Sequence, residues 1–137
     1  MVEHEVGNDD AETATVNPIN AYITSAQFDI DDGDKFSFVS RLLPDVTFDG
    51  STVDGAAISM SLSTLKNSGA GRKSPASTGG NSGGDVLRTV TTPVEEYTGQ
   101  INLRIRGRQI SLKLESTAFG VAWQSGVQRL DIRPDGR

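Results

Sequence analysis

The stretch Gln100 to Glu115, QINLRIRGRQISLKLE, combines the periodicity of β-strands with a turn signal. Its apolar side chains alternate with polar ones on both sides of Gly107-Arg108: Ile101, Leu103, Ile105, Ile110, Leu112 and Leu114. Glycine followed by a polar residue fits a two-residue type II′ turn, which joins antiparallel strands. We therefore expect a β-hairpin that pairs Ile105 with Ile110 and places the six apolar side chains on one face.

The other face of the expected hairpin is polar and carries three cations. Arg104 and Arg106 lie on its first strand, and Lys113 lies on its second strand, opposite Asn102. No aromatic side chain stands between the arginines, so this face is a poor platform for stacking nucleic-acid bases. The three cations form a basic patch and a candidate interface.

Two alternating segments precede the hairpin. From Tyr22 to Ile30 and from Phe36 to Leu42 the even positions are mostly apolar, which predicts two strands facing one core. A three-residue loop, Asp31-Asp32-Gly33 with a left-handed glycine, would join them and pair Phe28 with Phe36. We expect a second hairpin here.

The middle of the chain predicts two further strands. Ile58, Met60 and Leu62 alternate with serines, which gives a strand with one apolar and one hydroxyl-rich side. Val86 to Thr92 is a strand candidate that we expect to end at Pro93.

A last hairpin is expected between Phe119 and Ile132. Its turn is Ser125-Gly126, and its register sets Val121 against Leu130. Trp123 would then cover the end of the core rather than stack on a ligand.

These segments predict an all-β fold, an antiparallel β-sandwich or barrel-like domain of about seven strands. Residues 14–137 form one β domain, in which 67–85 are a long, flexible Gly/Ser-rich loop. Residues 1–13 are acidic and poor in apolar side chains, so we expect a disordered arm. The predicted core is Ile101, Leu103, Ile105, Ile110, Leu112, Leu114, Phe28, Phe36 and Phe38.

Catalytic chemistry has little support in the sequence. The chain has no cysteine, and its only histidine, His4, lies in the expected arm, so no triad is available to Ser82 in the protease-like segment GNSGG. The segment GAGRKS lacks the glycine that precedes lysine in a phosphate-binding loop. No apolar run approaches the ~18 residues that span a bilayer. We expect no enzyme, no cofactor and no membrane span.

The acidic cluster before Gly33 is explained by turn chemistry. The spacing of its four carboxylates does not fit a calcium-binding EF-hand loop, because no glutamate stands six residues after the glycine. We therefore expect a turn and no metal site. The cluster consists of Asp29, Asp31, Asp32 and Asp34.

Charge is unevenly distributed along the chain. Residues 1–66 hold 12 acidic and 3 basic side chains, whereas residues 88–137 hold 5 acidic and 8 basic ones. Such a division can hold one protomer against the next or direct the basic part toward an anionic partner, and its other reading is a set of solvated strand faces. We expect salt-sensitive self-association in which Arg104, Arg106 and Lys113 contact the acidic cluster of a neighbour.

Two stretches together resemble a known family: FSFVSRLLPDVTFDGST, Phe36 to Thr52, and the segment from Leu103 to Arg137. They are similar to the carboxy-terminal part of tail nozzle, tail-tube or stabilisation proteins of short-tailed bacteriophages. The motifs that carry the resemblance are Leu43-Pro44-Asp45, Arg106-Gly107-Arg108-Gln109, Trp123 and the terminal RLDIRPDGR from Arg129.

The resemblance implies a virion structural protein, made in the host cytoplasm and built into the phage tail. Its partners would be copies of itself in a ring, six in the case of nozzle proteins, and other tail proteins, with passive contact to packaged DNA left open. The alternative is a β-sandwich module that binds a host surface receptor or glycan, in which Trp123 would be the ligand-stacking residue.

Overall fold

The computed structural model describes residues 7–10, 15–66 and 86–136, and this part of the chain is all-β and contains no helix. It has twelve strands rather than about seven. The excess over the prediction is accounted for by five strands of only two residues, and the other seven have four or more. The strands are β1 (Asp9–Asp10), β2 (Asn17–Pro18), β3 (Ala21–Thr24), β4 (Phe28–Asp29), β5 (Ser37–Leu43), β6 (Val46–Thr47), β7 (Ala57–Leu65), β8 (Val86–Glu95), β9 (Ile101–Gly107), β10 (Gln109–Ser116), β11 (Gln124–Ser125) and β12 (Arg129–Pro134).

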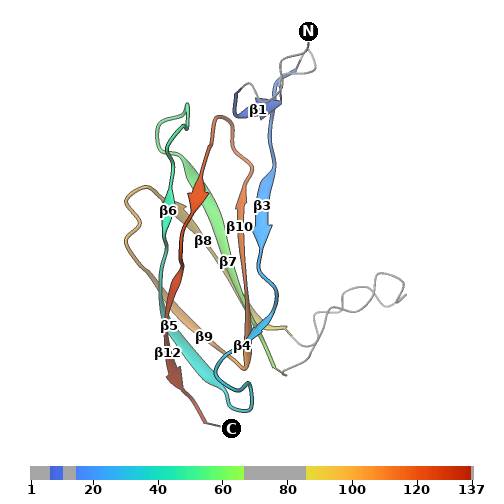
Figure 1. Ribbon diagram of the computed structural model, residues 1–137, viewed down its shortest axis with the longest axis vertical. Coiled ribbons are helices and arrows are strands. Elements are labelled where there is room, and N and C mark those ends of the chain that lie inside the picture. Colours follow the sequence, from blue (N-terminus) through green and yellow to red (C-terminus); the bar gives the residue numbers. More distant parts are fainter. Residues whose placement is uncertain (1–6, 11–14, 67–85, 137) are drawn as a thin grey trace, which may run out of the picture.

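Two antiparallel sheets form a sandwich-like arrangement (Figure 1). The first sheet has the order β3-β10-β7-β8, and β4 also pairs with β10. The second sheet has the order β12-β5-β9. Short two-stranded pairs, β1 with β2 and β11 with β6, complete the pairing. β1 and the end of β12 lie at opposite ends of the long axis.

The expected hairpin around Gly107 is wrong, because the two strands belong to different sheets. β9 pairs with β5, whereas β10 pairs with β3, β4 and β7. The chain therefore crosses from one layer to the other at Arg108, whose N–H donates to the Leu65 carbonyl at 2.9 Å. Such a connection is a β-arch. The Arg108 carbonyl in turn accepts from the Ile30 N–H at 2.9 Å.

Gly107 serves the arch through its lack of a side chain. A type II′ turn would need a positive φ at this glycine, and Gly107 is not among the positive-φ residues of the described chain. A Cβ atom here would instead lie 2.6 Å from the Thr64 Cβ, closer than real side chains allow. The glycine is required because the arch passes directly against β7.

The second and third expected hairpins are also wrong. β4 pairs with β10 and β5 with β9 and β12, so the loop around Gly33 again connects the two sheets. Gly33 does adopt the predicted left-handed conformation, with φ of 70°. β12 returns to β5 instead of pairing with the segment after Phe119, and Gln124–Ser125 pairs with β6.

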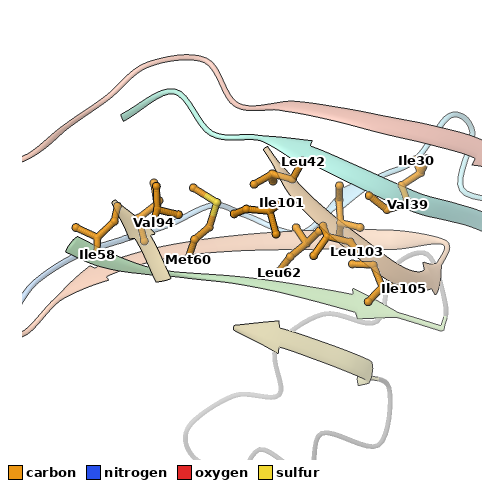
Figure 2. Packing of buried hydrophobic residues seen from close by; sticks show 12 residues of the cluster. Ile30, Val39, Leu42, Ile58, Met60, Leu62, Val94, Ile101, Leu103 and Ile105 are labelled. Atoms are coloured by element: carbon orange, nitrogen blue, oxygen red, sulfur yellow. The ribbon is translucent and has the colours of Figure 1, made fainter. Parts of the chain in front are cut away.

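The side chains that alternate along the strands meet between the sheets (Figure 2). In that view Ile58, Met60 and Leu62 of β7 lie across from residues of β5 and β9. Of the predicted core, five members are buried, and Leu112 is half-buried against them. The buried core is Ile30, Val39, Leu42, Ile58, Met60, Leu62, Val94, Ile101, Leu103, Ile105, Ile110 and Leu114.

The three phenylalanines assigned to the core are not in it. Phe28 is 45% exposed, on a strand at the edge of its sheet, while Phe36 and Phe38 are half-buried. In β5 the pairing register shifts around Ser40, so the buried positions change from Val39 to Leu42. The expectation that even-numbered residues face the core therefore holds only after the register shift at Ser40.

Two other expectations need correction. β8 does not end at Pro93, because it is an edge strand and a missing N–H on its free side costs no ladder bond. Within the expected disordered arm, residues 7–10 are ordered: β1 pairs with β2, and the Asp9 carboxylate accepts from the Gly120 N–H at 2.8 Å.

Paired cysteines would test the arch directly, since the native chain has none. Ser61 and Lys113 are directly opposite in adjacent strands, so Ser61→Cys with Lys113→Cys should form a disulfide within the monomer. Asn102→Cys with Lys113→Cys would be opposite in a hairpin but lies on opposite outer faces of the sandwich, so it should stay reduced. Non-reducing gels of the oxidised monomers distinguish the two, and ready crosslinking of the second pair would contradict the arch.

Truncation of two leucines on β10 compares how much a buried and a half-buried side chain contribute to stability. Leu114 is 4% exposed, so Leu114→Ala should lower the free energy of unfolding by about 2–5 kcal/mol through lost burial and a residual cavity. Leu112→Ala is the matched control and should cost less, because Leu112 is only half-buried. Urea unfolding measures both, and an equal or larger loss for Leu112→Ala would contradict this packing.

Candidate functional site

The outer face of the β12-β5-β9 sheet gathers positive charge. Residues opposite one another in an antiparallel pair project to the same side. The register places Arg133 of β12, Phe38 of β5 and Arg106 of β9 in one row, and the buried row beside it contains Val39 and Ile105. This row therefore points to solvent.

All seven arginines of the described residues lie on or beside this surface, which we call the arginine face. Two aspartates on the same strands and their ends, Asp131 and Asp135, are the carboxylates that accompany them. The chain as a whole has a net charge of −5, so the positive charge is locally concentrated. The arginines are Arg41, Arg88, Arg104, Arg106, Arg108, Arg129 and Arg133.

Some of these guanidinium groups are held by the fold itself. Arg106 forms an ion pair with Asp135, and the Arg41 Nη2 lies 3.3 Å from the Asp131 Oδ2. The guanidinium carbons of Arg106 and Arg108 lie 4.2 and 4.7 Å from the centroid of the Phe36 ring. These cation–π contacts fix two positive groups at one end of the face.

Five arginines of the face have no carboxylate partner among the described residues: Arg88, Arg104, Arg108, Arg129 and Arg133. Arg88 stands on β8 and donates from Nη1 to the Arg104 carbonyl at 3.1 Å, so the edge of one sheet reaches the edge of the other. These charges are available to a ligand.

An open groove of about 600 Å³ lies where β8 meets β9. Apolar side chains and polar ones share its lining, with two arginines among the latter. Its lining residues are Phe38, Ser40, Arg88, Val90, Asn102, Leu103 and Arg104. The groove thus combines an aromatic ring with two guanidinium groups.

The predicted three-residue basic patch is divided by the arch. Arg104 and Arg106 lie on the arginine face, whereas Lys113 lies on the outer face of the other sheet. There its Nζ is 2.7 Å from the Glu115 Oε2 and 5.4 Å from the centroid of the Tyr22 ring. The prediction that Arg104, Arg106 and Lys113 form one contiguous patch is therefore wrong.

Around Lys113 the outer face of the first sheet is rich in hydroxyl groups. Ser61 and Ser63 of β7 share hydrogen bonds of 2.8 Å with Thr91 and Thr89 of β8. This confirms the predicted strand with one apolar and one hydroxyl side. The sandwich therefore has one cationic and one largely neutral outer face.

The acidic cluster forms a turn, as its chemistry predicts. Asp31 has a φ of 57°, and the Gly33 N–H donates to the Ile30 carbonyl at 3.1 Å. Asp29 accepts from the Gln109 side-chain amide at 2.8 Å, while Asp31, Asp32 and Asp34 are exposed. Residues 7–10, 15–66 and 86–136 contain no group of three or more potential metal ligands. The role of these carboxylates in an interface stays a prediction.

The side of the sandwich away from β8 and β9 is open. The outer edges of β3 and β12 have no partner strand among the described residues. Ile23, Phe28 and Ile132 project toward the interior, in register with Leu114, Ile110 and Val39, yet their exposures are 55%, 45% and 37%. We call these edges and side chains the open seam.

Trp123 has the role predicted for it. It packs against the core, and its indole N–H donates to the Ser116 hydroxyl at 3.0 Å. Its ring is therefore committed to the fold. His4 and Ser82 lie outside the described residues, as do the segments GAGRKS and GNSGG.

Sequence reasoning missed the aromatic residue of the arginine face. Alternation along the sequence predicts that Phe36 and Phe38 lie in the core, which leaves the arginines without interleaved aromatics. The register shift in β5 turns Phe38 outward between Arg106 and Arg133. The alternation of arginines in LRIRGR and LDIRPDGR was a visible signal, but only tertiary structure brings these segments together on β5.

Comparison with known proteins does not assign the chain to a family. The chain matches no protein-family model, and a search of curated proteins also finds no match. In the part of the chain that the structure describes, no helix has the length and apolar character needed to cross a membrane.

Proposed function

We propose that this protein is a non-enzymatic structural protein of a bacteriophage tail, a nozzle or tail-tube component. In this proposal it assembles with copies of itself and with other tail proteins through the surfaces of its sheets. The sequence resemblance supplies the phage assignment. The open seam is the observation that supports assembly.

Unpaired strand edges are templates for pairing with another chain. β3 ends one sheet and β12 ends the other on the same open side, so pairing of β3 with β12 of a second copy can also set β12 against β3 of that copy. Such mutual pairing gives a two-fold dimer, whereas a contact through one edge only repeats from copy to copy and closes into a ring when the rotation between copies permits it. Burial of Ile23, Phe28 and Ile132 would add apolar stabilisation.

The glycan-binding alternative loses the residue on which it depended. Trp123 packs on the core and donates its N–H to Ser116, so it does not present a free ring to a sugar. No other described feature favours this alternative.

Substitution at the open seam tests the proposed assembly. The wild-type protein should form oligomers whose population rises with concentration in analytical ultracentrifugation. Ile23→Lys should shift them toward monomer, because it places a charge on the apolar edge. Tyr97→Lys is the matched control: Tyr97 is 91% exposed in the turn after β8, and its replacement should leave association unchanged.

The same experiment separates apolar from electrostatic assembly. Association through the seam should persist at raised salt, whereas contact between arginines and the acidic cluster should weaken. A wild-type protein that stays monomeric at all concentrations, or equal effects of Ile23→Lys and Tyr97→Lys, would contradict assembly through the seam.

A further inference from the structure

We infer that the arginine face binds single-stranded nucleic acid, with phosphates on its arginines and a base against Phe38 in the groove between β8 and β9. This binding site goes beyond the proposed assembly role and does not depend on the phage assignment. It uses a different surface from the open seam, so both can operate in one molecule.

Charge selects the class of ligand. The face carries seven arginines and two aspartates on a protein whose net charge is −5, which attracts a polyanion to one side of the sandwich. All of these cations are arginines, whose planar guanidinium group can donate two parallel hydrogen bonds to a phosphate. The described lysines are Lys35, Lys66 and Lys113, and Lys113 lies on the outer face of the other sheet.

The row that crosses the sheet suits an extended strand. Arg133, Phe38 and Arg106 are in register on three neighbouring strands, and adjacent strands are about 4.8 Å apart. Arg104 and Arg88 continue the positive charge from β9 to β8. A polyanion can therefore contact cations across the whole width of the sheet.

The groove favours an unpaired base over a duplex. Part of its lining is apolar and comes from Phe38, Val90 and Leu103. Polar phosphates and sugars do not match such a surface, whereas the flat face of a base does. Aromatic rings bind the faces of unpaired bases by stacking, with little dependence on sequence. Asn102 and Ser40 add hydrogen-bonding groups beside the ring. The Phe36 ring, in contrast, is already covered by Arg106 and Arg108.

Fluorescence anisotropy with a labelled oligothymidine of about 20 nucleotides tests this inference on the 137-residue chain. The wild-type protein should bind at low salt, and its affinity should fall as salt is raised. Arg104→Gln and Arg133→Gln should each weaken binding and reduce the slope of log affinity against log salt by about 0.7, the value for one lost phosphate contact.

Phe38→Leu separates base stacking from charge. It should weaken oligothymidine binding by about tenfold, while binding of a duplex of equal length changes by less than about twofold. Lys113→Gln removes one positive charge from the opposite outer face and is the matched control, which should bind as the wild type does. RNA of the same length distinguishes a ribose contact from a general single-strand site.

Four outcomes would overturn the inference. They are no binding at low salt, an effect of Lys113→Gln equal to that of Arg104→Gln, full binding by Phe38→Leu, or competition by polyglutamate as strong as that by oligothymidine. The last would assign the arginine face to an acidic protein partner, such as the exposed Asp31, Asp32 and Asp34 of a second copy. Circular dichroism of each variant confirms that the sheet is retained.

Discussion

The close contact between Gly107 and Thr64 sets the arrangement of the two sheets. Because there is no Cβ at this position, the chain can pass against β7 and leave one sheet for the other. The backbone of Arg108 is held on both sides of the crossing, by the Leu65 carbonyl and by the Ile30 N–H, at 2.9 Å in each case. Any side chain larger than hydrogen at residue 107 would push the arch away from β7.

The arch also determines which charges lie together. In a hairpin, Arg104 and Lys113 would share one polar face. In the arch, β9 carries its arginines to the outside of one sheet, while β10 carries Lys113 to the outside of the other. One sheet then collects arginines from β5, β9 and β12, and the other presents serine and threonine hydroxyls. The difference between the two outer faces follows from the same crossing that builds the core.

The two lateral sides of the sandwich also differ in a way that matters for binding. On one side β8 approaches β9, and Arg88 bonds to the backbone of Arg104, which forms a groove with polar and aromatic lining. On the other side the edges of β3 and β12 leave apolar side chains exposed. A polyanion fits the first environment, and a protein strand fits the second.

The sequence by itself determined the class of structure and much of the core. Period-two alternation places Ile101, Leu103 and Ile105 on the buried side of a strand whether that strand lies in a hairpin or in an arch, so their burial was predictable. Turn chemistry at Gly33 and the packing of Trp123 depend on local composition and size, and they were predicted too.

Only the tertiary structure decided which strands pair and which side chains lie beside one another on the outer faces. The pairing of β10 with β7, about 50 residues away in the chain, is favoured over the local hairpin because it lets the apolar faces of β9 and β10 contribute to one core between the sheets. The register shift in β5 then turns Phe38 outward beside arginines from two distant strands. Alternation within a segment cannot reveal either result, since both arise from contacts between segments far apart in the sequence.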